Sequence, residues 1–140
     1  MKKHILLIED EREELSVFVQ ALNETQLSYK CTYAKDCTHA LQMLDYLVPD
    51  YIFVDQNRSG VNYMDGLRSI RQKQKLRSVP VILFSGSMTQ DIADKATYLG
   101  INYCFMKPSG IESLSILLAD IILSDPKDGE IRNPSVKTPG

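Results

Sequence analysis

Cysteine is scarce in this sequence, where Cys31, Cys37 and Cys104 are the only three in 140 residues. Their odd number and the absence of a CxxC spacing argue against a disulfide framework. Neither His4 nor His39 completes a zinc-ligand pattern with a cysteine. We therefore interpret the three cysteines as reduced structural thiols.

Long apolar runs and an excess of one charge are also missing. No segment approaches the roughly 20 apolar residues of a membrane-spanning helix, and the short apolar run near the start is unlike a secretion signal. The formal net charge of −2 gives no strong attraction to nucleic acid or an anionic membrane. We therefore expect a cytoplasmic protein that binds neither directly. The basic run over residues 68–77 has no interleaved aromatic side chain and is interpreted as a solvated helix face.

The remaining composition is that of an ordinary globular domain, with 44% hydrophobic and 24% charged residues. Residues 1–124 show regular apolar periodicity and are predicted to form one domain. Residues 125–140 are rich in proline, glycine and charge without periodicity. We expect that segment to be a flexible tail or the start of a linker.

Short apolar runs alternate with segments of helical periodicity along the first 124 residues. The runs predicted as strands are His4–Ile8, Tyr29–Tyr33, Tyr51–Val54, Pro80–Phe84 and Ile101–Met106. A helix is predicted after each strand. This alternation indicates an α/β fold, with a parallel sheet covered by helices on both faces.

Several residues predict where these helices begin and end. Thr38 is a candidate cap of the second helix, and Asp65–Gly66 should open the third. The pairs Ser87/Gln90 and Ser109/Glu112 have the spacing of capping boxes for the fourth and fifth helices. Gly100 should close the fourth helix as its C-terminal glycine.

Residues suited to binding or chemistry, together with two that shape the backbone, follow four of the predicted strands. They are Glu9 and Asp10 after the first, Asp55 after the third, Ser85 and Gly86 after the fourth, and Lys107 and Pro108 at the end of the fifth. Ligands of open parallel sheets bind at the carboxyl ends of the strands. Carboxylates about 4 Å apart repel each other by roughly 1–4 kcal/mol, so such a cluster needs cations. Lys107 is one, and Mg²⁺ is the natural second because all the other ligands are oxygens.

These motifs resemble those of the receiver domains of two-component response regulators, including chemotaxis regulators, over residues 3–124. The matching segments are Ile5–Glu11, Pro49–Asp55, Met64–Leu67, Pro80–Gly86 and Phe105–Pro108. The resemblance implies a doubly wound, flavodoxin-like five-stranded sheet with strand order 2-1-3-4-5. It also implies a signalling switch, which is not an enzyme beyond assisting its own phosphorylation and dephosphorylation.

The resemblance further implies how a phosphoryl group would be accepted. Asp55 would take it from a phosphohistidine of a sensor histidine kinase or a histidine phosphotransfer protein. Mg²⁺ would be held directly by Asp10 and Asp55, by Glu9 through water, and by the backbone carbonyl of Asn57. The downstream target or output domain is not specified by the sequence.

The resemblance also implies how the phosphoryl group would be sensed. Lys107 and Ser85 would contact phosphoryl oxygens, and Gly86 would leave room for the group. The Lys107–Pro108 bond is expected to be cis, aiming the lysine inward. The movement of Ser85 would bias the face formed by the fourth helix, fifth strand and fifth helix, a face that could also form a homodimer.

Two features depart from the family pattern. The stretch between Asp55 and Gly66 is about three residues longer than usual, and we interpret its loop as a neutral surface insertion. Cys104 stands where relatives have an aromatic switch residue. Strand alternation should place its neighbours Tyr103 and Phe105 on the opposite face, so a small side chain is expected to replace the aromatic one.

Three alternative functions belong to other classes of protein. A phosphohydrolase with an aspartate nucleophile would need a second aspartate two residues later, where this chain has Asn57. A flavin-binding module would need a phosphate cradle after the first strand, where Glu9 and Asp10 would repel phosphate. A pseudo-receiver that only docks to partners stays open, although every active-site residue type is present.

Overall fold

The computed structural model describes residues 2–56 and 63–124. Its centre is one sheet of five parallel strands in the order β2-β1-β3-β4-β5. The strands are β1 (Lys3–Ile8), β2 (Tyr29–Ala34), β3 (Tyr51–Asp55), β4 (Val81–Ser85) and β5 (Tyr103–Met106). The expected strand order and flavodoxin-like fold are confirmed.

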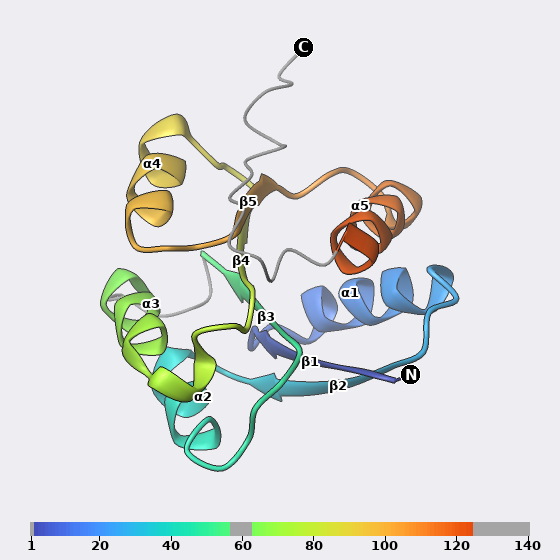
Figure 1. The fold of residues 1–140 in the computed structure, drawn as a ribbon. Helices are drawn as coiled ribbons and strands as arrows, with labels where there is room; N and C mark the ends of the chain where they lie inside the picture. Colours follow the sequence, from blue (N-terminus) through green and yellow to red (C-terminus); the bar gives the residue numbers. More distant parts are fainter. Residues whose placement is uncertain (1, 57–62, 125–140) are drawn as a thin grey trace.

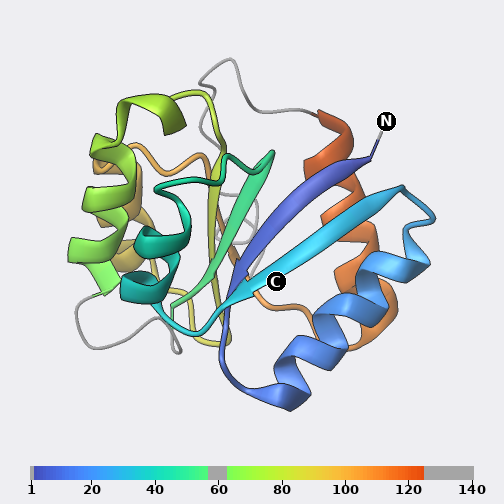
Figure 2. The same ribbon diagram turned by 90° about the horizontal axis from the view of Figure 1, so that it is seen from below.

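Helices cover both faces of the sheet (Figures 1 and 2). They are α1 (Arg12–Glu24), α2 (Cys37–Met43), α3 (Tyr63–Gln72), α4 (Gln90–Tyr98) and α5 (Ile111–Ser124), with a short 3₁₀ turn η1 (Gln74–Leu76) after α3. Helices α1 and α5 lie side by side on one face, and α2, α3 and α4 lie on the other (Figure 1). Within the described residues, no helix is long and apolar enough to span a membrane.

The two faces of the sheet bury two separate apolar clusters, because successive strand side chains point to opposite sides. Phe84, Tyr103 and Phe105 pack in the cluster under α1 and α5. Leu83 and Cys104 pack in the other, under α2, α3 and α4. The prediction that Tyr103 and Phe105 lie across the sheet from Cys104 is therefore confirmed.

The fourth helix ends as the sequence predicted. Gly100 has a φ of +90°, a left-handed conformation that glycine adopts without steric cost. Its amide donates to the Thr97 carbonyl, and the Ile101 amide donates to the Ala96 carbonyl, both over 3.0 Å. This is the hydrogen-bond pattern of a Schellman motif, which closes a helix at glycine.

The start of the second helix differs from the prediction. Asp36, and not Thr38, is the N-cap of α2, and its carboxylate accepts a hydrogen bond from the His39 amide over 2.8 Å. Helix α3 also begins earlier than predicted, at Tyr63 instead of Asp65. Thr38 and Asp65, which were predicted to start these helices, instead lie inside the first turn of each.

The capping boxes predicted for the last two helices are wrong. Helix α4 is capped by Thr89, whose hydroxyl accepts from the Ile92 amide, because the Ser87 amide is held by the Ser85 hydroxyl in the turn after β4. Helix α5 begins after Gly110, whose φ of +88° leaves Ser109 outside the helix.

Candidate functional site

Two acidic side chains are buried at the carboxyl edge of the sheet. Glu9 directly follows β1, and its amide donates to the Ala34 carbonyl of β2 over 2.8 Å. Asp55 is the last residue of β3, the neighbouring strand. Only 2% of Glu9 and 1% of Asp55 is exposed. Such burial of two carboxyl groups is costly unless other groups compensate for it.

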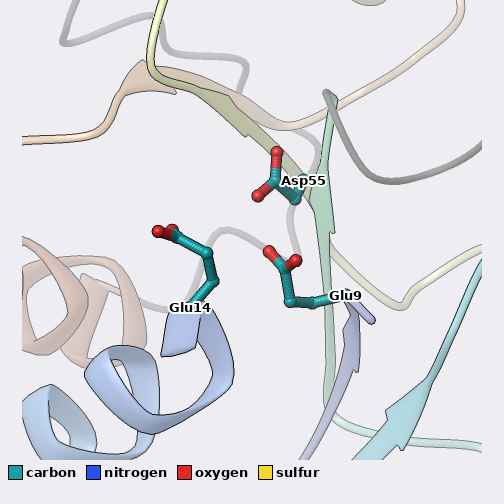
Figure 3. Close-up of side chains that lie close together, drawn as sticks. All are labelled: Glu9, Glu14 and Asp55. Carbon is teal, nitrogen blue, oxygen red and sulfur yellow. The ribbon is translucent and has the colours of Figure 1, made fainter. Parts of the chain in front are cut away.

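A third carboxylate, which the sequence interpretation missed, joins this pair. Carboxylate oxygens of Glu9, Glu14 and Asp55 all lie within 4.8 Å of one another, and Figure 3 shows the three side chains converging. Glu14 comes from the first turn of α1. The preference of acidic residues for the first turn of a helix beside the strand ends could have indicated it.

The predicted ligand Asp10 lies differently from Glu9. Asp10 is exposed, and the acidic cluster consists of Glu9, Glu14 and Asp55 without it. Asn57, whose carbonyl was expected to complete the ligand set, lies outside the described residues.

Lys107 compensates for part of the negative charge. Its Nζ donates to Asp55 Oδ2 over 2.7 Å and to Glu14 Oε1 over 2.5 Å, and it lies 5.1 Å from the centre of the Phe84 ring. Burial alone would lower the pKa of Lys107, but the hydrogen bonds with Asp55 and Glu14 outweigh it and raise that pKa. The ammonium group therefore stays charged between its two anionic partners.

In Glu9, by contrast, the raised pKa favours the neutral form of the side chain. Burial, with the hydrogen bond and the charge of Asp55, raises the pKa of Glu9 to about 8, against an ordinary value of 4.5. The Glu11 amide and Lys107 offset this only in part. One lysine therefore does not neutralise the cluster, and a further cation would favour the ionised form of Glu9.

Ser85 ends β4, the strand next to β3, at the same edge of the sheet. It is fully buried, donates to Gln56 Oε1 over 2.8 Å and accepts from the Ser87 amide over 3.0 Å. Gly86 follows it, and a Cβ atom built there would meet nothing within 4 Å. The site thus has open space next to Ser85.

The remaining predicted residues lie behind this edge. Cys104 is completely buried, and desolvation raises the pKa of its thiol to about 12. Pro108 lines a small pocket together with Lys107 and Phe84. The expected cis Lys107–Pro108 bond is wrong, because no peptide bond among the described residues is cis. Lys107 reaches Asp55 from a trans bond, so the isomer is not needed to aim it.

The fold and these contacts define a class: a flavodoxin-like α/β domain with a buried acidic cluster and a lysine at the carboxyl edge of its sheet. Comparison with known proteins narrows the class. Residues 5–119 match the family described as Response regulator receiver domain, which covers most of the chain. The chain therefore belongs to the response regulator receiver domain family, a family of two-component signalling.

Individual relatives agree with this assignment. Chemotaxis protein CheY of Pseudomonas aeruginosa is 32% identical over 75 residues, which are 54% of this chain and 60% of that relative. The match thus spans less than two thirds of the relative's own length. Two solved structures share the fold at 21% identity. The Mn²⁺-bound form of response regulator Rcp1 matches with a TM-score of 0.72, and the match covers 85% of this chain and 91% of the Rcp1 chain. The phosphorylated cyanobacterial phytochrome response regulator RcpA has a TM-score of 0.74, with coverages of 86% and 91%.

Proposed function

We propose that this chain is a phosphoacceptor switch and that Asp55 accepts a phosphoryl group from a phosphohistidine of a histidine kinase or histidine phosphotransfer protein. The observation that best supports this is the Asp55–Lys107 contact of 2.7 Å at the end of the central strand. It pairs a buried carboxylate with a cation that can also bind the negatively charged oxygens of an incoming phosphoryl group. The phosphorylated form of RcpA, which has a similar fold, also supports the proposal.

The transfer exchanges one bond to phosphorus for another. An Asp55 oxygen forms the new O–P bond while the P–N bond of the phosphohistidine breaks. The imidazole leaves with the electron pair of that bond and takes up a proton. Lys107 pairs with a phosphoryl oxygen and offsets charge during transfer, and Gly86 leaves the group space beside Ser85.

The donor set suits Mg²⁺ as a cofactor. The acidic cluster offers carboxylate oxygens within 4.8 Å of one another and contains neither histidine nor cysteine, as a hard divalent ion prefers. Asp55 and, through water, Glu9 of this cluster would hold it, with Asp10 and the Asn57 carbonyl as further ligands. When bound, the ion supplies positive charge that offsets the acids and the transferring phosphoryl group. The Mn²⁺-bound form of Rcp1 supports a metal site of this kind.

Phosphorylation would change the surface that the protein presents to partners. The protein would therefore act as a switch and not as an enzyme with a separate substrate. Inward movement of Ser85 would bias the face formed by α4, β5 and α5 through differential contacts in the two states. That face would then bind a downstream protein or a second copy of the chain in the cytoplasm. We infer no membrane partner and no direct nucleic-acid binding.

The test is intact mass after incubation with acetyl phosphate, with and without Mg²⁺. We expect the wild-type protein to gain one phosphoryl group only with Mg²⁺, and Asp55→Asn to gain none. Beryllofluoride, which mimics the acyl phosphate, should bind with the same Mg²⁺ dependence. A wild-type protein that neither gains mass nor binds beryllofluoride would identify a docking module without a switch, and steady release of phosphate from small esters would favour the phosphohydrolase.

A further inference from the structure

The Ser85 hydroxyl has no proton left to donate in the unphosphorylated protein. Its oxygen accepts the Ser87 amide over 3.0 Å, and its only proton is donated to Gln56 Oε1 over 2.8 Å. A hydroxyl has one proton to donate. Ser85 therefore cannot donate to a phosphoryl oxygen while it donates to Gln56.

Gln56 is well placed to hold that hydroxyl. Its amide donates to the Phe84 carbonyl over 2.8 Å, which fixes its backbone to β4 directly after Asp55. Its side chain is half-buried, so water competes only in part for the Ser85 proton. The acceptor therefore lies next to the phosphorylation site along the chain and next to Ser85 in space.

We propose that Gln56 is a positioning residue that holds the Ser85 hydroxyl in the unphosphorylated state and releases it when Asp55 is phosphorylated. This inference rests on the proposed function, because it assigns a regulator of the same site. Gln56 is the first residue of the long loop after Asp55, which the sequence alone suggested to be a neutral insertion. On this proposal, that first residue has a regulatory role.

The size of the effect follows from linkage between the two states. A hydrogen bond made only in the unphosphorylated state stabilises that state by some factor in the equilibrium between the two states. Because a phosphoryl mimic binds the other state, the same factor weakens its binding. For a neutral hydrogen bond in a protein, this factor is about two- to tenfold. Gln56→Met has nearly the same length but only a weak sulfur acceptor, so it should raise beryllofluoride affinity by up to that factor.

The decisive experiment is a double-mutant cycle on the full chain, with beryllofluoride binding measured at fixed Mg²⁺. We expect Gln56→Met to tighten binding about two- to tenfold and Gln56→Glu, which keeps an acceptor, not to tighten it. In a Ser85→Ala background Gln56→Met should have no effect. Gln20→Met, an exposed glutamine on α1, is the matched control. An unchanged affinity, or an equal gain without Ser85, would overturn the inference.

A second measurement separates this inference from the proposed function. The four proteins of the cycle (wild type, Gln56→Met, Ser85→Ala and the double variant) are unfolded with urea in the absence of any phosphoryl mimic. We expect Gln56→Met and Ser85→Ala to be coupled, with a coupling of about two- to tenfold in the unfolding equilibrium constant. Additive effects would overturn the Gln56–Ser85 contact itself. Coupling without beryllofluoride binding in any variant would overturn both the proposed function and the release step, and leave only a structural contact.

Discussion

Lys107 Nζ lies 2.5 Å from Glu14 Oε1, so the lysine that contacts Asp55 has a second anionic partner on the first helix. This partner would stand beside a phosphoryl group on Asp55 and repel it. Two unit charges about 4 Å apart interact by roughly 1 kcal/mol even at the dielectric constant of water, which corresponds to about fivefold in an equilibrium constant.

We therefore expect Glu14→Gln to increase beryllofluoride affinity about fivefold or more, and to speed phosphorylation by acetyl phosphate. The measurements are titration at fixed Mg²⁺ and intact mass against time. Glu13→Gln is the matched control, since it removes the same charge from an exposed position in the same turn of α1. Equal effects of both substitutions would show that general charge, and not the contact with Lys107, is responsible.

The raised pKa of Glu9 predicts a pH dependence of stability. Between its ordinary value of 4.5 and about 8, folded Glu9 keeps a proton that the unfolded chain has lost. The folded state thus binds more protons in this window, and its stability should fall as pH rises through it. Thermal unfolding with a chelator present should show this fall.

Glu9→Gln isolates the contribution, because it removes the titrating group and little else. Its unfolding temperature should decline less between these pH values than that of the wild-type protein. Added Mg²⁺ should recover stability most at the high end of the window, where Glu9 is ionised. Parallel pH profiles for the two proteins would mean that Glu9 titrates normally.

Gly66 on α3 lies tightly against Cys37 on α2. A Cβ atom at Gly66 would overlap the Cys37 Cβ and lie 2.7 Å from its Sγ. We expect Gly66→Ala to destabilise the protein by about 1–3 kcal/mol, the usual result of overpacking, as measured by urea unfolding. Gly86→Ala, where the added atom meets nothing within 4 Å, should change stability little. Equal stability of both variants would contradict the close approach of α2 and α3.

The three thiols should be unreactive in the folded protein. Burial raises the pKa of Cys31 and Cys104 to about 12 and that of Cys37 to about 11, and only the thiolate reacts. With a thiol-alkylating reagent near neutral pH, intact mass should show no label on the native protein and three labels after unfolding. Rapid labelling of the native protein at Cys104 would mean that β5 is accessible from the α4 side.

Much of the fold could be predicted from the sequence because its strands are continuous apolar runs. Tyr51–Asp55 and Val81–Ser85 are buried throughout, and such runs fit only a sheet covered on both faces. Gly100 was also predictable, since only glycine readily adopts the left-handed conformation after a helix. The residue classes at the strand ends then placed Asp55, Ser85 and Lys107 at one edge.

The parts that could not be predicted depend on which side chain caps each turn and on how the helices pack. Thr89 caps α4 in place of Ser87 because Ser85, on the preceding strand, holds the Ser87 amide. Glu14 joins the site only because α1 packs with its first turn beside β3. The spacing of a capping box does not show which acceptor the Ser87 amide binds, and the spacing of α1 does not show how that helix packs.

Asp55 and Lys107 are 52 positions apart along the chain, and this separation affects how the protein folds. The strands β3, β4 and β5 must pair side by side, through two helical crossovers, before the carboxylate and the ammonium group can meet. Each closure costs chain entropy before any contact repays it. The proposed phosphorylation site is thus complete only after these strands have paired, and we expect a chain that is still folding not to react with a phosphodonor.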